Sequence, residues 1–359
     1  MKQNDMTVQN QMTPVLKQRG QASVDFFSAL AKAASPLRQK ANAYFSEVIE
    51  DPGALPDDLD ARHAAMTPHI NKCGAFRVHQ LSKEWHARYH GVAAIEAFNA
   101  ASETLVPKLK ALEAGPAQVI YDQGSRPPAY WDGVNFHRTS GGWNGHAYQG
   151  YIHSEIVHGQ IVEAVFPGGL AKQRRFVAAL APKDHYASIL DMGCSAGQFT
   201  RALAEAYPDA DISGVDLSAK TLEQAQRVAN ANGWGWKLFE RPAEDTRFEE
   251  NSFDLVTSYI LLHEVPRDVM DRILAEAFRV LKPGGDLLFS DVTRFSNLDK
   301  LAEWQADHDA KYGGEPHWRG SASQNLASLA KTAGFEQVDE RGIEPRSYPH
   351  VLSARKPLK

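Results

Sequence analysis

The sequence of 359 residues has few cysteines, no long apolar run and no excess of basic charge. Its two cysteines, Cys73 and Cys194, cannot form a disulfide framework or a cysteine-ligated zinc site, and they favour a reducing compartment. No stretch of about 18 apolar residues occurs and the N-terminal segment is polar, so we expect neither membrane spanning nor export. A net charge of −5 argues against a general nucleic-acid binder. We therefore expect a cytoplasmic protein without a membrane or nucleic-acid partner.

Histidine is the residue type with the most uneven distribution, because nine of the 14 precede residue 160. His79, His86 and His90 share one face of a predicted helix with spacing that would suit a metal ion. No acid or cysteine completes an obvious ligand set, and Trp85 and Tyr89 stand beside them. We therefore assign no metal site from the sequence and interpret these histidines as part of helix packing.

Four segments differ in composition and in hydrophobic spacing. Residues 1–20 are polar and predict a disordered tail, whereas residues 21–115 carry apolar residues at helical spacing. These helices need a partner for their apolar faces, which would be the rear domain under a cap or a second copy in a homodimer. Residues 116–184 combine an aromatic, glycine-rich loop with a helix from about His146 to Val165, interpreted as a lid. Residues 185–359 predict an α/β domain.

The rear segment alternates short apolar runs with amphipathic stretches. The predicted strands are 188–191, 211–216, 235–239, 253–258, 286–291, 336–341 and 347–355. The predicted helices between them are about 198–207, 219–231, 268–281 and 323–333. Seven strands with such crossovers predict a Rossmann-like, doubly wound sheet with an added N-terminal helical domain.

A glycine turn follows the first of these strands. Asp191, Gly193 and Gly197 lie where the strand gives way to a helix, and ligands of such sheets bind at the carboxyl ends of the strands. The two glycines are four positions apart, so the dinucleotide pattern G-x-G-x-x-G is not met and NAD or FAD is not expected. Asp216 ends the second strand, where a carboxylate suits the two hydroxyls of a ribose.

These motifs, together with the AED turn Ala243–Asp245 before NSFD and the LKPGG turn ending at Gly285, resemble class I S-adenosylmethionine-dependent methyltransferases. The nearest subgroup is similar to the ubiquinone and menaquinone C-methyltransferases, and the resemblance spans about Tyr186 to Arg355. It implies the seven-stranded methyltransferase sheet, S-adenosyl-L-methionine as cofactor, and methyl transfer to a small-molecule acceptor.

The resemblance also implies which residues hold the cofactor. The methionine end would be held by Asp191 and the loop with Gly193, Cys194, Ser195 and Gly197, the ribose by Asp216, and the adenine by Leu217, Ala243, Glu244 and Asp245. The backbone of Ser258 and Tyr259 would face the sulfonium. Ser195 stands where many members have glycine, which is tolerable if its φ angle is not left-handed. Pro242 replaces an adenine-binding aspartate, so Glu244, Asp245 or a backbone group would substitute.

His263, five residues after the fourth strand, suits a general base that removes a proton from the acceptor, with Glu264 as its partner. The alternative is that His263 only shapes the pocket. On the predicted lid helix, Tyr148, Tyr151, Glu155 and His158 share one face. We interpret Tyr151 as a catalytic and Tyr148 as a substrate-binding candidate, against the alternative that both tyrosines pack in the core.

A long insertion follows the fifth strand and carries four aromatic or imidazole side chains that are candidates for a second wall of the acceptor pocket. These are Trp304, His308, Tyr312 and Trp318. The alternative is a surface excursion anchored by its aromatic residues.

The function expected from the sequence is methylation of a small molecule on O, C, N or S by in-line displacement. One alternative is methylation of protein or RNA. Two features argue against it: the net negative charge, and the sequence SYILLHEVP after the fourth strand, where such enzymes have a sequence of the Asn-Pro-Pro-Tyr or Asp-Pro-Pro-Tyr type. The other alternative is a sensor or scaffold that binds the cofactor without catalysis.

Overall fold

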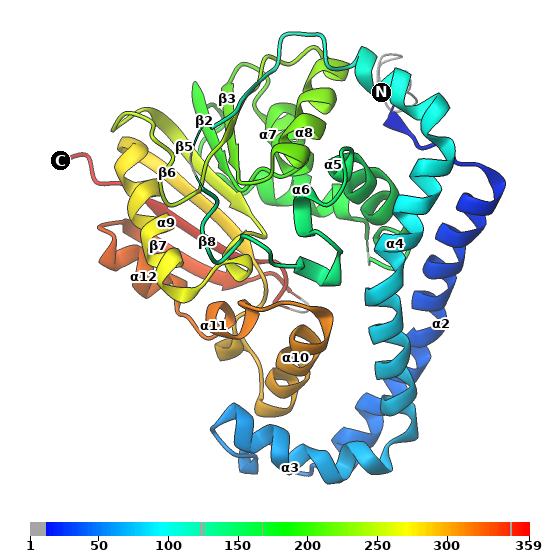
Figure 1. Ribbon diagram of the computed structural model, residues 1–359. Coiled ribbons are helices and arrows are strands. Elements are labelled where there is room, and N and C mark those ends of the chain that lie inside the picture. Colours follow the sequence, from blue (N-terminus) through cyan, green and yellow to red (C-terminus); the bar gives the residue numbers. More distant parts are fainter. Residues whose placement is uncertain (1–11, 123, 125, 167, 345–346) are drawn as a thin grey trace.

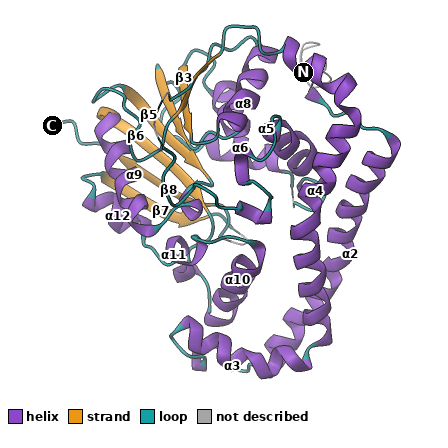
Figure 2. Ribbon diagram, in the orientation of Figure 1, coloured by secondary structure: helices purple, strands orange, loops and turns teal. Residues whose placement is uncertain are grey.

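The computed structural model describes residues 12–122, 124, 126–166, 168–344 and 347–359. It contains an eight-stranded sheet with helices on both faces (Figures 1 and 2). The strands are β1 (Gln118–Ile120), β2 (Ser188–Met192), β3 (Asp211–Asp216), β4 (Lys237–Glu240), β5 (Phe253–Tyr259), β6 (Leu281–Asp291), β7 (Glu336–Gly342) and β8 (His350–Arg355). The longer helices are α2 (Gln18–Val48), α3 (Leu59–Lys72), α4 (Gly74–Ala111), α6 (Leu170–Ala178), α7 (Gln198–Ala206), α8 (Ala219–Asn232), α9 (Arg267–Val280) and α10 (Lys300–Gly313). The shorter helical elements are α5 (Gln149–Tyr151), η4 (Ile152–Val162), α11 (Trp318–Ala322) and α12 (Leu326–Thr332), with 3₁₀ turns η1 (Pro52–Ala54), η2 (Phe136–Arg138), η3 (Gly142–Asn144), η5 (Leu262–Glu264) and η6 (Phe295–Asn297).

The sheet confirms the predicted α/β fold. Its strand order is β1-β4-β3-β2-β5-β6-β8-β7, and β8 runs antiparallel to both of its neighbours while the other pairs are parallel. All seven predicted strands are present, and β1 is an addition at the edge. This strand has only three residues, too few for a sequence pattern, and it forms because Val119 aligns with Leu238 of β4.

The central strands are buried on both faces, as expected for parallel strands between helical layers. On β2, Ile189 packs in the cluster that contains α7 and α8, whereas the next residue, Leu190, packs in the cluster that contains α9 and α12. Both side chains are fully buried. The parallel strands therefore present their carboxyl ends at one common edge, between the two layers of helices.

The N-terminal helices are continuous with this core. Helices α2 and α4 lie side by side (Figure 1), and Val24 of α2 and Phe98 of α4 belong to the same buried cluster as Ile189. At their other end, Phe45 packs on Trp304 of α10, with ring centroids 5.3 Å apart. The helical segment thus covers the α7 and α8 side of the sheet and also α10. None of the described helices combines the length and apolar character needed to cross a bilayer.

Part of the predicted disordered tail, residues 1–20, is ordered in the structure. Met12 is buried, and α2 begins at Gln18. Residues 1–11 of that prediction lie outside the described residues.

The predicted lid helix is a different kind of helix. Instead of one α-helix from about His146 to Val165, the short α5 is followed by the π-helix η4. Its hydrogen bonds join residues five positions apart, so side chains five apart share a face, whereas an α-helix would place them on different faces. This change of period alters which side chains of the segment face inward. Helices α6, α10 and α11 were not among the predicted elements.

Candidate active site

A cavity of about 460 Å³ lies at the carboxyl ends of β2, β3 and β5. Its wall combines the glycine loop after β2, the segment of residues 126–144, here called the aromatic segment, and the inner face of η4. The predicted site residues on its wall are Gly193, Cys194, Ser195, Asp216, Leu217, Ala243, Glu244, Tyr259, His263, Glu264 and Trp318. This position is the one expected for a ligand of a doubly wound sheet.

The loop after β2 is held against β3 through its backbone. The N–H groups of Gly193 and Cys194 both donate to the carbonyl of Val215, at 2.8 and 3.0 Å. Gly193 has φ +72°, and a Cβ there would lie 2.9 Å from the Leu261 side chain. Ser195 has φ +49°, so the condition that it avoids the left-handed region is not met. Its backbone carries that strain, because a serine replaces a residue type that adopts this conformation freely.

Asp216 fastens the loop to α8. Its Oδ2 accepts a hydrogen bond from Ser195 N at 2.9 Å, and its Oδ1 accepts one from Ser218 N at 2.8 Å. Burial raises the pKa of this carboxyl, while the hydrogen bonds from Ser218 and Ser195 oppose the shift. Ser218 is the N-cap of α8, and its hydroxyl also donates to the carbonyl of Trp143 at 2.9 Å. One strand end therefore positions the candidate ribose acid and anchors the aromatic segment.

Asp191 lies behind the loop rather than on the cavity wall, which corrects its expected contact with the methionine end. The carboxylate is 1% exposed and accepts from the hydroxyls of Thr200 at 2.7 Å and Thr257 at 3.4 Å. Burial raises its pKa to about 7, against the opposing effect of these two hydrogen bonds. Gly197 also lies outside the wall, where it begins α7 with φ +79°. Both residues shape the loop from behind.

At the candidate adenine end, the structure distinguishes between the two acids after Pro242. Glu244 lines the cavity and accepts hydrogen bonds from the Tyr130 hydroxyl at 2.7 and 2.9 Å. Asp245 is exposed, lies off the cavity wall and pairs with Arg247 at 3.4 Å. The contact expected of Asp245 is therefore corrected, and Tyr130 of the aromatic segment joins the site.

The end of β5 supplies the next part of the wall. Tyr259 stacks on Phe199 with ring centroids 5.0 Å apart, and burial raises its pKa to about 12. Ser258 is buried one position earlier and is not on the wall. Ile260 lines the cavity with φ +61°, a strained conformation for a β-branched side chain that costs about 1–3 kcal/mol. Such strain is concentrated at functional positions.

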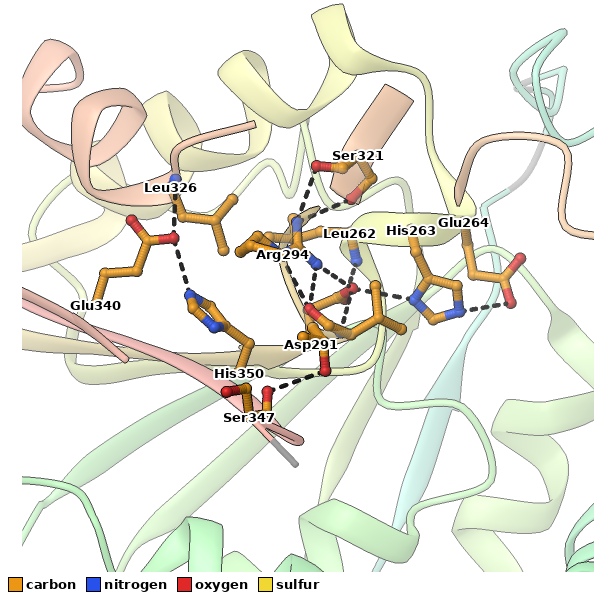
Figure 3. A network of polar contacts seen from close by, with 12 residues as sticks. Leu262, His263, Glu264, Asp291, Arg294, Ser321, Leu326, Glu340, Ser347 and His350 are labelled. Atoms are coloured by element: carbon orange, nitrogen blue, oxygen red, sulfur yellow. Dashed lines mark hydrogen bonds and ion pairs between the residues drawn. The ribbon is translucent and has the colours of Figure 1, made fainter. Parts of the chain in front are cut away.

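His263 is the centre of a buried polar network (Figure 3). Its Nδ1 lies 3.2 Å from Asp291 Oδ1, and its Nε2 lies 3.5 Å from Glu264 Oε1. Arg294 contacts the same Asp291 oxygen at 3.1 Å. Burial alone would lower the pKa of His263, but Asp291 outweighs this effect and raises the pKa to about 10. The ring is then an imidazolium at neutral pH, which cannot accept a proton, so this arrangement does not suit the predicted general base.

Tyr148 and Tyr151 lie outside the cavity, which corrects both predicted roles. The Tyr151 side chain is buried in the core, and its hydroxyl donates to the Met12 carbonyl at 3.1 Å. Tyr148 packs on Phe98 and beneath the guanidinium of Arg227. The prediction assumed α-helical spacing from residue 146 onward, and the π-helix that follows α5 directs other side chains inward.

Three candidates from the insertion after β6 also lie away from the cavity. Trp304, His308 and Tyr312 stand on α10, where Trp304 Nε1 lies 3.1 Å from His63 Nδ1 of α3. His308 stacks between His63 and Tyr312. The insertion turns toward the N-terminal helices because their apolar faces need cover. Only Trp318 of this set lines the cavity, edge-on to His263 at 5.1 Å.

One residue of the predicted lid face, His158, lies on the wall, and two further histidines there were not predicted. His153 and His158 of η4 face the cavity, with ring centroids 4.2 Å apart, and His137 lies on the aromatic segment. Burial lowers the pKa of both η4 histidines, so these rings are neutral. Their five-residue spacing is the signal of a π-helical face, which an α-helical reading separates.

Comparison with known proteins places the chain in a family. The Methyltransferase domain family matches residues 189–285. An uncharacterized methyltransferase of Synechocystis is 37% identical over 154 residues, which are 42% of this chain and 67% of that protein.

Two named relatives are also similar. The ubiquinone/menaquinone biosynthesis C-methyltransferase of Desulfotalea psychrophila is 35% identical over 120 residues, 33% of this chain. The chain spans about half the length of that relative, 47%. A malonyl-[acyl-carrier protein] O-methyltransferase of Methylococcus capsulatus is 27% identical over 235 residues, 65% of this chain and 76% of the relative. The residues matched by the family, 189–285, include the ends of β2, β3 and β5 that form the cavity.

Proposed function

Because the chain belongs to the class I S-adenosylmethionine-dependent methyltransferases, we propose that it transfers a methyl group from S-adenosylmethionine to a small-molecule acceptor. When bound, the cofactor supplies an electrophilic methyl group on sulfur, which an acceptor atom attacks in line while the carbon–sulfur bond breaks. The observation that supports this function is one continuous cavity that extends from Asp216 and Glu244 to His263 and Trp318.

The residues present suit such a cofactor. Gly193 brings backbone to the cavity wall at a position where any side chain would meet Leu261. Asp216 is a carboxylate held by two backbone N–H groups, so its position is fixed before any ligand arrives. Glu244, oriented by Tyr130, is an acidic group on the cavity wall two positions after Pro242, and it would contact the adenine edge. These groups would bind and orient the ligand by proximity and alignment, which can supply most of the barrier reduction for an activated methyl donor.

The aromatic segment favours a small acceptor over a macromolecule. Trp131, Phe136, Trp143 and Trp318 all stand on the cavity wall, so aromatic side chains form much of its lining. Pockets of this size and lining are typical of small-molecule sites. Since His263 is held as an imidazolium by Asp291, we infer that it positions groups in the site and supplies positive charge. The accepting atom in this proposal is O, C, N or S.

The test is transfer of a labelled methyl group. The protein is incubated with methyl-labelled S-adenosylmethionine and either a metabolite extract or a mixture of protein and RNA. We expect label in the small-molecule fraction with the wild type and none with Asp216→Ala. Label in protein or RNA would support the macromolecular alternative instead. Cofactor binding by calorimetry without any transfer would support the sensor or scaffold.

A homodimer through the N-terminal helices is part of the proposal. Its support is a stripe of exposed apolar side chains on α4, here called the α4 stripe, formed by Val78, Leu81, Trp85, Tyr89 and Val92. Their spacing of three and four positions places them on one face of the helix. Contiguous exposed apolar surface marks protein interfaces more often than free surface. The cytoplasmic location predicted from the composition also remains a proposal.

A further inference from the structure

Three metal-ligating side chains from distant parts of the chain meet on the cavity wall. His137 comes from η2, Glu264 from η5, and Glu315 from the turn after α10. His137 Nε2 lies 3.1 Å from Glu264 Oε1, and His137 Nδ1 lies 2.5 Å from Glu315 Oε1. One ligand atom from each of the three residues lies within 4.8 Å of the other two. A single ion could therefore reach all three.

The two carboxylates are only half satisfied. Glu264 Oε2 and Glu315 Oε2 are buried and have no hydrogen-bond partner among the described residues. The side chains are 14% and 10% exposed, and both lie on the wall of the cavity. A buried acceptor without a partner costs about 1–3 kcal/mol, and more when it is charged. Two such oxygens in one cluster point to a ligand that both would contact.

The backbone holds His137 in place between the two acids. His137 and Arg138 have φ +51° and +56°, in the region that side chains disfavour. His137 N donates to the carbonyl of Gly314 at 3.2 Å, next to Glu315. Gly314 has φ +89°, and a Cβ there would lie 2.9 Å from Arg138 N. The close approach of these two turns fixes the imidazole beside both carboxylates.

A simple ion-pair clamp is the alternative reading. An imidazolium between two glutamates accounts for the inner oxygen of each carboxylate, but it leaves both outer oxygens without partners among the described residues. A divalent cation would balance the two negative charges and bind oxygen and nitrogen together. One imidazole with two carboxylates suits Mn²⁺, Fe²⁺ or Zn²⁺, whereas Ca²⁺ prefers oxygen ligands alone and Cu⁺ prefers sulfur.

We propose that His137, Glu264 and Glu315 bind one divalent transition-metal cation in the cavity, beside Trp318. Three protein ligands leave coordination positions open toward the cavity. His263 would act as a positioning residue, because its Nε2 contacts Glu264 while Asp291 holds its other nitrogen (Figure 3). If the proposed methyl transfer is correct, the cation would hold an acceptor through oxygen donors, which points to acceptors with two neighbouring oxygen atoms.

The sequence could not reveal this site. Its ligands lie 127 and 51 positions apart, and the stretch with metal-compatible spacing, His79 to His90, contributes none of them. The sequence led us to expect no metal site, and the proposed site differs from that expectation.

The experiment measures binding of Mn²⁺ and of Zn²⁺ to the full chain without cofactor or acceptor. After removal of metal with EDTA, Mn²⁺ binding is followed by loss of the free-ion electron paramagnetic resonance signal, and Zn²⁺ binding by calorimetry. We expect about one ion per chain for the wild type. His137→Gln and Glu315→Gln should each weaken binding at least about tenfold, since loss of even a supporting residue costs 10–100-fold. The matched controls His185→Gln and Glu205→Gln change residues of the same types away from the cavity wall and should bind like the wild type.

Two results would overturn the site. One is a wild type that takes up neither ion stoichiometrically, and the other is unchanged binding in both ligand variants. Circular dichroism verifies that the variants fold, and Glu264→Gln provides a third ligand variant if one of the others does not. S-adenosylmethionine binding is titrated separately. A wild type that binds S-adenosylmethionine but neither metal ion would refute only the metal site, whereas a wild type that binds metal but neither binds S-adenosylmethionine nor transfers a methyl group would refute the proposed function.

Discussion

Replacement of Asp191 by asparagine should make the folded protein less sensitive to pH. The carboxylate is 1% exposed and has no ion-pair partner among the described residues, only the hydroxyls of Thr200 and Thr257. Burial raises its pKa to about 7, whereas an aspartate in an unfolded chain has a pKa of about 4. The folded state therefore binds a proton more tightly than the unfolded state does.

The sign and size of the effect follow from linkage. Below pH about 4, both states are protonated and the group costs nothing. Between pH of about 4 and about 7 the unfolded state loses its proton first, so the free energy of unfolding falls as the pH rises, and above pH of about 7 the penalty is constant. A difference of about three pKa units corresponds to about 4 kcal/mol, an upper value because relaxation of the site would reduce it. The asparagine side chain of the variant cannot ionise, so the variant lacks this loss.

Urea unfolding of the ligand-free protein at pH of about 5 and about 8 tests this reasoning. The free energy of unfolding of Asp191→Asn, minus that of the wild type, should be larger at the higher pH than at the lower one by up to about 2.6 kcal/mol, because about 1.4 kcal/mol of the penalty is already present at pH of about 5. Asp209→Asn changes an exposed aspartate and should give the same difference at both pH values. The reasoning is refuted if the Asp191→Asn difference is independent of pH. We also expect the variant to bind S-adenosylmethionine more weakly, because a charge behind the glycine loop would attract the cofactor's ammonium group.

Three further changes test separate parts of the site and surface. Asp216→Ala removes the acceptor that joins Ser195 to Ser218 and should abolish cofactor binding in calorimetry; unchanged affinity would refute the ribose assignment. Tyr130→Phe removes the hydroxyl bound to Glu244 and should weaken cofactor binding about tenfold, since hydrogen bonds to charged groups contribute about 1.5–3 kcal/mol, while exposed Tyr89→Phe should have no effect. Leu81→Glu, at an α4 stripe position that is 70% exposed, should halve the mass measured by light scattering; a wild-type monomer would refute the dimer.

The strands and the strand-end motifs could be predicted because each depends on neighbours in sequence. β3 forms from a short apolar run, and Asp216 is its last residue, so predicting the strand also predicts that this acid lies at a strand end. The parallel order then brings Asp216 to the loop of Gly193, which pairs with Val215. The cofactor end of the cavity needs little beyond this, since helices and turns there follow directly from the strands.

The acceptor end could not be predicted in the same way, because it depends on segments that pack without a common pattern. Trp304 and Tyr151 are aromatic residues in the expected segments, yet both pack toward the N-terminal helices. That choice depends on which apolar surface lacks cover, a property of the whole fold. In η4, the π-helical period brings His153 onto the inward face beside His158, whereas Tyr151, which was expected on that face, packs in the core.

The contact between His263 and Asp291 could have been predicted from the order of the strands. His263 follows β5, and Asp291 ends β6, so each lies at the end of a strand that the sequence predicts. Adjacent parallel strands bring their carboxyl ends together, and β5 and β6 are neighbours. The order of this sheet therefore predicts that a histidine just after β5 meets an acid at the end of β6. That pairing favours the protonated ring and removes the proton acceptor that the isolated histidine suggests. A base for the acceptor, if one is needed, must then come from another group, because burial lowers the pKa of His153 and His158 on the same wall so far that both rings are weak proton acceptors.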